Sequence, residues 1–258
     1  MKPWLLLLLA GLLLPGCVRP LPPPPDGLVP GPLARRIMGE RSAAVMVAAR
    51  ASIQEWADQR FSKHGGDEDV DGGSAVPITP DGYFLTADHV LARVNGERNA
   101  FVLYGLGGRL VTARARVVWR SNAADLALLH VPLATPRFYQ WTPPGRRLPE
   151  GTWVVHAGIA TGRESPPGKL STALAPERRW TGSRRFKIDI QLKPGDSGGA
   201  VVDAHGLLVG INSAVEFLVP MDTAFFVDSE GCRPNVRQLE SLIRSDRLRK
   251  NRAESGVE

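Results

Sequence analysis

The feature that most constrains this chain is a glycine-rich turn, Gly195-Asp196-Ser197-Gly198-Gly199, followed directly by the apolar run Ala200-Val201-Val202. Glycines on both sides of a serine allow backbone conformations that other residues avoid. Such a turn presents the serine hydroxyl outward and leaves main-chain N–H groups unpaired beside it. A nucleophile needs both, because nearby donors must hold the negative charge that develops on an attacked carbonyl. Taken alone, the stretch also fits a hairpin turn with an incidental serine.

A second turn, Pro80-Asp81-Gly82, lies between the apolar segments 73–79 and 83–87 and predicts a β-hairpin. Proline presets φ at its position, and glycine takes the left-handed one. His89 follows the second strand of this hairpin. A single histidine at such a place is more often structural than catalytic, so its position alone assigns no role.

An acid opens a later apolar strand, because Asp125 precedes Leu-Ala-Leu-Leu at residues 126–129. Asp88 is the nearer acid in sequence to His89. Neighbouring strand residues point to opposite faces, however, so Asp88 is not expected to orient the imidazole. The order His89, Asp125, Ser197 is the chymotrypsin-type order of a catalytic triad, and not the order of subtilisin or of the α/β-hydrolases.

Three motifs together resemble the trypsin-like serine proteases, and in particular their bacterial Deg/HtrA branch. They are Leu-Thr-Ala-Asp-His ending at His89, Asp-Leu-Ala-Leu-Leu beginning at Asp125, and Gly-Asp-Ser-Gly-Gly around Ser197. The resemblance covers roughly residues 43–230. It implies an all-β, chymotrypsin-like fold of two six-stranded antiparallel β-barrels, followed by a C-terminal α-helix.

The same resemblance implies roles for these residues. His89 takes the proton of Ser197 and later gives it to the leaving amine, while Asp125 holds the imidazole in the required tautomer. The N–H groups of Gly195 and Ser197 form the oxyanion hole. The implied reaction is endoproteolysis of protein or peptide substrates through an acyl-enzyme, with no cofactor and no metal.

The substrate pocket is expected from Gln191 and from the strand segment Asn212-Ser213-Ala214. In trypsin an acid six residues before the serine draws Arg or Lys into the pocket, and here Gln191 has that position. Small or medium apolar residues are therefore expected at the cut site. Asp196 is not expected to pair with a newly cut N-terminus as in digestive relatives, so we expect a form that needs no such cleavage.

The N-terminus has the pattern of a secretory signal, with Lys2 followed by a short apolar run over residues 5–14. That run is too short to span a bilayer comfortably. Leu14-Pro15-Gly16-Cys17 resembles the bacterial lipobox, although Pro15 departs from its usual small residue. The resemblance implies a Cys17 that carries acyl chains such as palmitate, and Val18 after it resembles the outer-membrane sorting pattern. A secreted protein with a chance cysteine is the alternative.

The chain is accordingly divided into a signal peptide (1–16), the lipidated cysteine with a proline-rich linker (17–32), the double barrel (33–232) and a helix with a polar tail (233–258). Four consecutive prolines favour a polyproline II spacer. Pro234 is expected in the first turn of the last helix, whose apolar face is Val236, Leu239, Leu242 and Ile243. Nothing after this helix is long enough for a PDZ domain, in contrast to most Deg proteins.

Several further elements are expected. Helices are predicted over 33–40 and, as a surface turn, over 54–63, and strands over 43–51, 111–119, 168–173 and 186–192. Residues 65–73 alternate acids with glycines but lack the EF-hand spacing, so a solvated loop is preferred over a calcium site. His130 and His156 are read as structural, with His130 on a strand surface.

Charge and cysteine content limit the partners. A net charge of +6 suits a protein near anionic lipid in the bacterial cell envelope, and no nucleic-acid-binding module appears. With Cys17 in the leader, Cys232 is expected to be unpaired and partly buried. Two rival functions remain: an inactive protease-like lipoprotein that acts as a binding module, and a structural envelope lipoprotein with chance motifs. The sequence does not fix the oligomeric state.

Overall fold

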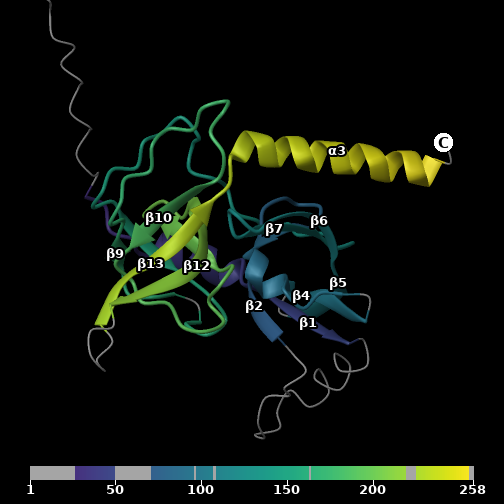
Figure 1. Ribbon diagram of the computed structural model, residues 1–258, viewed down its shortest axis with the longest axis horizontal. Coiled ribbons are helices and arrows are strands. Elements are labelled where there is room, and N and C mark those ends of the chain that lie inside the picture. Colours follow the sequence, from purple (N-terminus) through teal and green to yellow (C-terminus); the bar gives the residue numbers. More distant parts are fainter. Residues whose placement is uncertain are drawn as a thin grey trace, which may run out of the picture.

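In the computed structural model, two curled antiparallel sheets stand side by side, and a long C-terminal helix extends above the first of them (Figure 1). The structure describes residues 27–49, 71–95, 97–106, 109–162, 164–218 and 225–255. The expected leader, lipobox and linker up to residue 26, the helical turn over 54–63 and most of the acidic loop lie outside these residues. Among the helices within them, none is long and apolar enough to cross a membrane.

The first sheet has the strand order β5-β4-β1-β2-β3-β7-β6. Its elements are β1 (Ala43–Ala49), β2 (Asp71–Pro77), β3 (Tyr83–Thr86), β4 (Arg98–Leu106), β5 (Arg109–Arg114), β6 (Arg116–Ser121) and β7 (Leu126–His130). The sheet has seven strands because the single strand expected over 111–119 is bent at Ala115. The N–H of Ala115 donates to Ala100 O at 2.8 Å, so β5 stays on β4 while β6 turns onto β7. The two edge strands are therefore consecutive in the chain, and the sheet closes on itself as a barrel.

The second sheet has six strands in the order β10-β13-β12-β11-β8-β9. They are β8 (Trp153–His156), β9 (Gly168–Lys169), β10 (Arg184–Ile188), β11 (Ala200–Asp203), β12 (Leu208–Leu218) and β13 (Phe225–Arg233). A bridge between Leu170 and Ile188 joins its two edges. The strand expected over 168–173 is thus only two residues long, followed by this bridge. The all-β, double-barrel prediction is confirmed.

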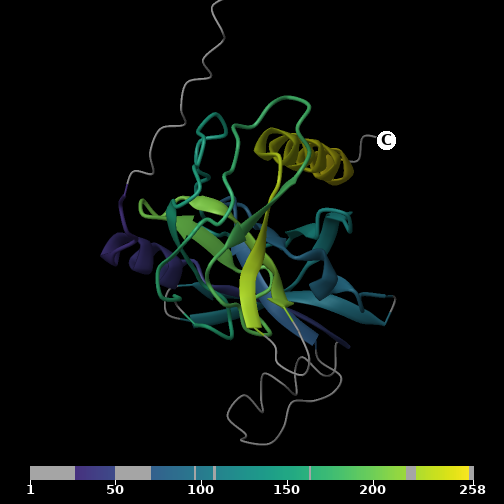
Figure 2. The same cartoon turned by 60° about the vertical axis from the view of Figure 1, so that its left-hand side comes forward.

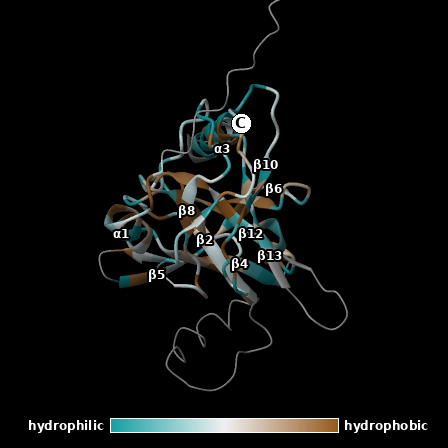
Figure 3. Cartoon of the chain, turned by 90° about the vertical axis from the view of Figure 1, so that its left-hand side faces the viewer, coloured by the Kyte–Doolittle hydropathy of each residue, from teal (hydrophilic) through white to brown (hydrophobic). Residues whose placement is uncertain are grey.

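The three largest of four hydrophobic clusters hold the molecule together, and hydrophobic residues occur in the central strands and in α1 (Figure 3). One fills the first barrel around Val45, Phe84 and Leu129, and another fills the second around Phe186 and Val201. The third lies between the barrels and includes residues of both sheets, of the helix α1 (Pro32–Glu40) and of α3 (Val236–Ser255). This shared core fixes one barrel against the other, with α1 and α3 on well-separated parts of the molecule (Figure 2).

The helix α3 begins at Val236, two residues after Pro234, so Pro234 precedes the helix and is not in its first turn as expected. Asn235 is the N-cap: its Oδ1 accepts from the N–H of Gln238 at 3.0 Å. The expected apolar face is confirmed, because Val236, Leu239 and Ile243 are buried and Leu242 is half-buried. Farther along, Asp246 accepts hydrogen bonds from the hydroxyl of Tyr83 at 2.9 Å and from the Arg116 guanidinium at 2.6 Å. These contacts dock α3 on the first barrel.

The expectation that His130 lies on a strand surface is wrong. Its exposed fraction is 8%, and its ring centroid lies 4.6 Å from that of Tyr83. Asp246 of α3 also contacts Tyr83, so the helix covers a face that strand alternation alone leaves open to solvent. Burial and the nearby Arg116 lower the pKa of His130. Gly82 adopts the left-handed conformation expected for its turn, with φ +88°.

Candidate active site

His89 lies in a short 3₁₀ helix, Asp88–Leu91, that directly follows β3. Its ring Nδ1 lies 3.0 Å from Oδ1 and 2.9 Å from Oδ2 of Asp125. The main-chain N–H of His89 also donates to Asp125 Oδ1, at 3.0 Å. The carboxylate therefore fixes both the backbone and the ring of this histidine, while the side chain stays 51% exposed.

Asp125 closes a tight turn before β7, in which its N–H donates to Asn122 O at 3.0 Å. Its φ of +49° is the only positive value among the described non-glycine residues. Aspartate tolerates this left-handed conformation better than bulky residues do, and such outliers concentrate at functional sites. The turn directs the Asp125 carboxylate toward His89 instead of along the strand.

The two groups shift each other's protonation. Burial acts to raise the pKa of Asp125, but hydrogen bonds from the His89 ring, the Ser213 hydroxyl and the His89 N–H outweigh it and lower that pKa to about 2. The hydrogen bond to Asp125 raises the pKa of His89 above 6.5, against the opposing effect of burial. A carboxylate that is always ionised thus sits beside an imidazole of increased basicity.

Asp88 points away from the His89 ring, although both residues lie in a 3₁₀ helix and not in the strand that the prediction assumed. Its Oδ1 accepts from Arg120 Nε at 2.6 Å, and the residue is buried. Asp88 is therefore occupied by an ion pair with β6 and does not contact the His89 ring.

Ser197 lies in a turn whose flanking residues Gly195 and Gly198 have φ of +101° and +84°. Its hydroxyl donates to Ser213 O at 3.3 Å, and the Ser213 hydroxyl donates to Asp125 Oδ2. Ser213 thus connects the serine of the second barrel with the acid of the first. Within the described residues the Ser197 hydroxyl makes this bond and none to the His89 ring.

Two main-chain donors beside Ser197 are free. In the part of the chain that the structure describes, the N–H groups of Gly195 and Ser197 donate to no protein acceptor. The N–H between them behaves differently, because Asp196 N donates back to Lys193 O at 2.9 Å. Among the described residues, the N–H groups on either side of Asp196 N therefore have no internal acceptor.

A strand of the first barrel also holds this turn. The N–H of Ser74 on β2 donates to Ser197 O at 2.8 Å, and its hydroxyl donates to Gly195 O at 2.8 Å. A Cβ on the neighbouring Gly73 would lie only 2.8 Å from a methyl of Val90 and 3.0 Å from Ser197 O. Sequence reasoning missed Ser74. Its only signal is a Gly-Ser pair on β2, the strand that pairs with β3 just before His89.

A family model described as "Trypsin-like peptidase domain" matches residues 73–211, a range that contains His89, Asp125 and Ser197. The chain belongs to the trypsin-like peptidase family. The predicted family is therefore confirmed, and His89, Asp125 and Ser197 lie in its matched region.

Similar proteins agree with this membership. The serine protease Do-like HtrA of Lactobacillus helveticus is 29% identical over 166 residues, which are 61% of this chain and 39% of that protein. A probable periplasmic serine endoprotease, DegP-like, of Hahella chejuensis is 28% identical over 184 residues, 65% of this chain and 37% of that one. This trypsin-like peptidase chain thus spans about two-fifths of the length of the curated relatives it matches.

Solved structures are similar in fold. The HtrA-type protease AlgW with a decapeptide has a TM-score of 0.54 at 22% identity, over 81% of this chain and 65% of that one. Deg5 also has a TM-score of 0.54, at 16% identity, over 82% of this chain and 89% of that one. At these identities the likeness shows the double-barrel fold of the peptidase.

The residues expected to line the substrate pocket differ in their exposure to solvent and in their contacts. Gln191 is exposed. Asn212 is fully buried, and its amide lies 3.2 Å from Asp196 O and 3.3 Å from His156 Nδ1. It therefore supports the turn that carries Ser197 from the protein interior. Ser213 connects the acid and the serine, and Ala214 continues β12.

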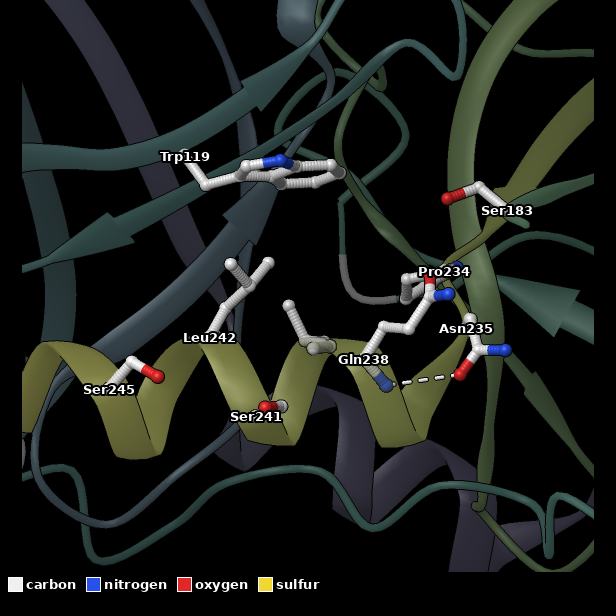
Figure 4. Close-up of a pocket in the computed structure, with 9 residues that line it drawn as sticks. Trp119, Ser183, Pro234, Asn235, Gln238, Ser241, Leu242 and Ser245 are labelled. Carbon is white, nitrogen blue, oxygen red and sulfur yellow. Dashed lines mark hydrogen bonds between the residues drawn. The ribbon is translucent and has the colours of Figure 1, made fainter. Parts of the chain in front are cut away.

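Other features of the peptidase lie apart from this site. A cavity of about 380 Å³ between α3 and β6 is lined by Trp119, Leu242 and several polar side chains (Figure 4), and His89, Asp125 and Ser197 are not among its lining residues. Among the described residues, no group of three or more His, Cys, Asp or Glu side chains is arranged to hold a metal ion. His156 is buried behind the turn, and this burial lowers its pKa.

Proposed function

We propose that this protein is a serine endopeptidase that uses Ser197, His89 and Asp125 as its triad. One observation carries the proposal: Asp125 contacts His89 Nδ1 at 2.9 Å and is linked through Ser213 to the Ser197 hydroxyl, beside two free N–H groups. A structural role for these motifs does not require this convergence.

The proposed chemistry follows from the contacts. With a proton on Nδ1 held by Asp125, the lone pair of His89 is on Nε2, which takes the proton of Ser197 as its oxygen attacks the carbonyl. The N–H groups of Gly195 and Ser197 stabilise the oxyanion; in related enzymes loss of one such donor costs roughly 3–4 kcal/mol. His89 then protonates the leaving amine, and water releases the acyl group by the same steps.

A fluorophosphonate probe tests this assignment. The wild-type protein is expected to be labelled at residue 197, and Ser197→Ala is expected to abolish labelling. Ser183→Ala, a half-buried serine in the cavity under α3, is the matched control and should label as wild type does. Labelling that persists in Ser197→Ala contradicts the assignment. A wild type that folds but is never labelled supports the rival, an inactive binding module.

We further propose that the enzyme is a lipid-anchored protein of the bacterial cell envelope, on the outer membrane facing the periplasm, in envelope protein processing or quality control. The lipobox-like residues ending at Cys17 and the sorting residue Val18 support this, as do relatives named as periplasmic. Metabolic labelling with an alkynyl fatty acid should mark the wild type and not Cys17→Ala, and equal labelling of both contradicts the anchor.

The proposed substrates are proteins or peptides cut after small or medium apolar residues. The absence of an acid at Gln191 supports this preference. A peptide-library cleavage profile measures it, and a profile dominated by Arg or Lys contradicts it.

A further inference from the structure

We infer that Thr161 is a positioning residue for the turn over residues 195–198, which we call the nucleophile turn. Thr161 holds this turn in the shape that the proposed reaction needs, with neither a newly cut N-terminus nor a cation as the partner of Asp196. The inference rests on the proposed peptidase function. It concerns Asp196, the acid immediately before Ser197, whose exposed fraction is 0%. A buried carboxylate is costly unless hydrogen bonds replace the water it loses.

Thr161 supplies two of the three hydrogen bonds that the Asp196 carboxylate receives. The Thr161 N–H donates to Asp196 Oδ1 at 2.8 Å, and the Thr161 hydroxyl donates to Oδ2 at 2.6 Å. The third donor is the N–H of Lys193, at 2.9 Å from Oδ2. None of the ion pairs found among the described residues includes Asp196. Two neutral donors of Thr161 therefore make most of the hydrogen bonds that stabilise the Asp196 carboxylate.

Thr161 belongs to a tight turn over residues 158–162, which we call the support turn. Gly158 and Gly162 bond each other across it, with N···O distances of 2.7 and 3.4 Å. A Cβ on Gly158 would lie 2.3 Å from Asp196 Oδ1, so only glycine lets the support turn approach so closely. This close approach places the Thr161 donors on the carboxylate.

The support turn holds the nucleophile turn at a second point. The N–H of Ile159 donates to the Ser74 hydroxyl at 2.9 Å, and that hydroxyl donates to Gly195 O at 2.8 Å. Gly195 is thus fixed through its carbonyl oxygen, and Asp196 is fixed through its side-chain carboxylate. With both fixed, the N–H groups of Gly195 and Ser197 stay directed away from internal acceptors.

Loss of the Thr161 hydroxyl should displace the N–H groups proposed to bind the oxyanion. We therefore expect it to lower kcat more than it raises KM. Thr161→Val keeps the shape and the N–H but leaves Asp196 Oδ2 with a single donor. A missing bond to a buried charged group corresponds to about a 10- to 100-fold slower acylation. Thr161→Ser keeps the hydroxyl and should restore most of the rate.

The experiment measures the rate of fluorophosphonate labelling, with kcat and KM for a peptide substrate and the unfolding temperature. The matched control is Thr152→Val, which removes another hydroxyl bond of the second barrel, to Pro149 O at 2.7 Å. Support is slow labelling and low kcat in Thr161→Val with KM within about twofold of wild type, rescue in Thr161→Ser, and no change in Thr152→Val. If Thr161→Val does not fold, Thr161→Ala makes the same test.

Two results overturn the inference and can be told apart. Labelling of Thr161→Val at the wild-type rate, or equal slowing in Thr152→Val, removes Thr161 from its role and leaves the proposed peptidase intact. A folded wild type that is not labelled at all removes the proposed function, and the role of Thr161 with it.

Discussion

The two barrels place their parts of the site by different means. In the first, side chains hold side chains: Asp125 contacts the His89 ring at 2.9 Å and anchors its N–H as well. In the second, main-chain conformation positions Ser197, with φ of +101° at Gly195 and +84° at Gly198. His89, the proposed base, is therefore positioned by bonds that can be removed singly, whereas Ser197, the proposed nucleophile, depends on the shape of a whole turn.

This difference teaches where a mutation should act. A change to an acid or base in the first barrel removes chemistry from an intact fold. A change to a glycine in the second barrel must move backbone that packs on Ser74, Thr86 and Ala87 of the other barrel. The two kinds of change should thus separate activity from stability, and four measurements test that separation.

The largest effect is expected from Asp125→Asn. The amide keeps the size of the side chain but favours the wrong tautomer of His89, so kcat should fall about 10⁴-fold, as for the same change in a related triad. Steady-state kinetics and thermal unfolding measure the result, and the unfolding temperature should change little. A kcat within tenfold of wild type would contradict the first half of the comparison.

Gly198→Ala should cost both stability and activity. A Cβ there would lie 2.1 Å from Ser74 O, and the residue has positive φ. We expect a loss of more than about 3 kcal/mol in the free energy of unfolding, measured by denaturant titration. The control is Gly27→Ala, which has φ of +68° but no heavy atom within 4 Å of the added Cβ, and should cost about 1 kcal/mol. Equal costs would show that steric contact between the barrels is unimportant.

The pH dependence of kcat/KM sharpens the description of the first barrel. Since the pKa of His89 is raised above 6.5 by Asp125, activity should fall as pH decreases through that raised value, where the imidazole becomes protonated. Asp125, with a pKa of about 2, stays ionised throughout this range. In Asp125→Asn the midpoint of the remaining activity should move down toward 6.5. A midpoint that does not move would assign the titration to another group.

The smallest effect is expected from Tyr83→Phe, which removes one hydrogen bond between the first barrel and α3, 2.9 Å long. The free energy of unfolding should fall by about 1 kcal/mol, with kcat unchanged. A fall in kcat would show that α3 reaches the site through its docking contacts, and the separation between chemistry and scaffold would then fail.

Sequence reasoning succeeded where local chemistry decides the structure. The turn at Gly82 and the apolar face of α3 both follow from residue type and spacing. Asp88 does point away from His89, but the two residues lie in a 3₁₀ helix, so the strand alternation used in the prediction is not the cause. The family follows from three short motifs whose order is specific in combination. The roles assigned to His89, Asp125 and Ser197 remain predictions.

It failed where distant segments meet. His130 looks exposed until α3 covers its strand, and Asn212 faces the interior because the nucleophile turn lies over it. The bend at Ala115 follows from closing a sheet and not from any local signal. Ser74 and Thr161 act through contacts with residues more than thirty positions away, which no periodicity in one sequence reveals.

The burial of Cys232 affects the reactivity of its thiol toward oxidants. Its exposed fraction is 0%, and burial raises the pKa of its thiol to about 11. The thiolate is the form of cysteine that attacks oxidants and disulfides, so a thiol with a raised pKa and no exposure is unreactive toward them. With Cys17 occupied by the proposed acylation, the protein can mature among oxidants and oxidoreductases without offering them a reactive sulfur.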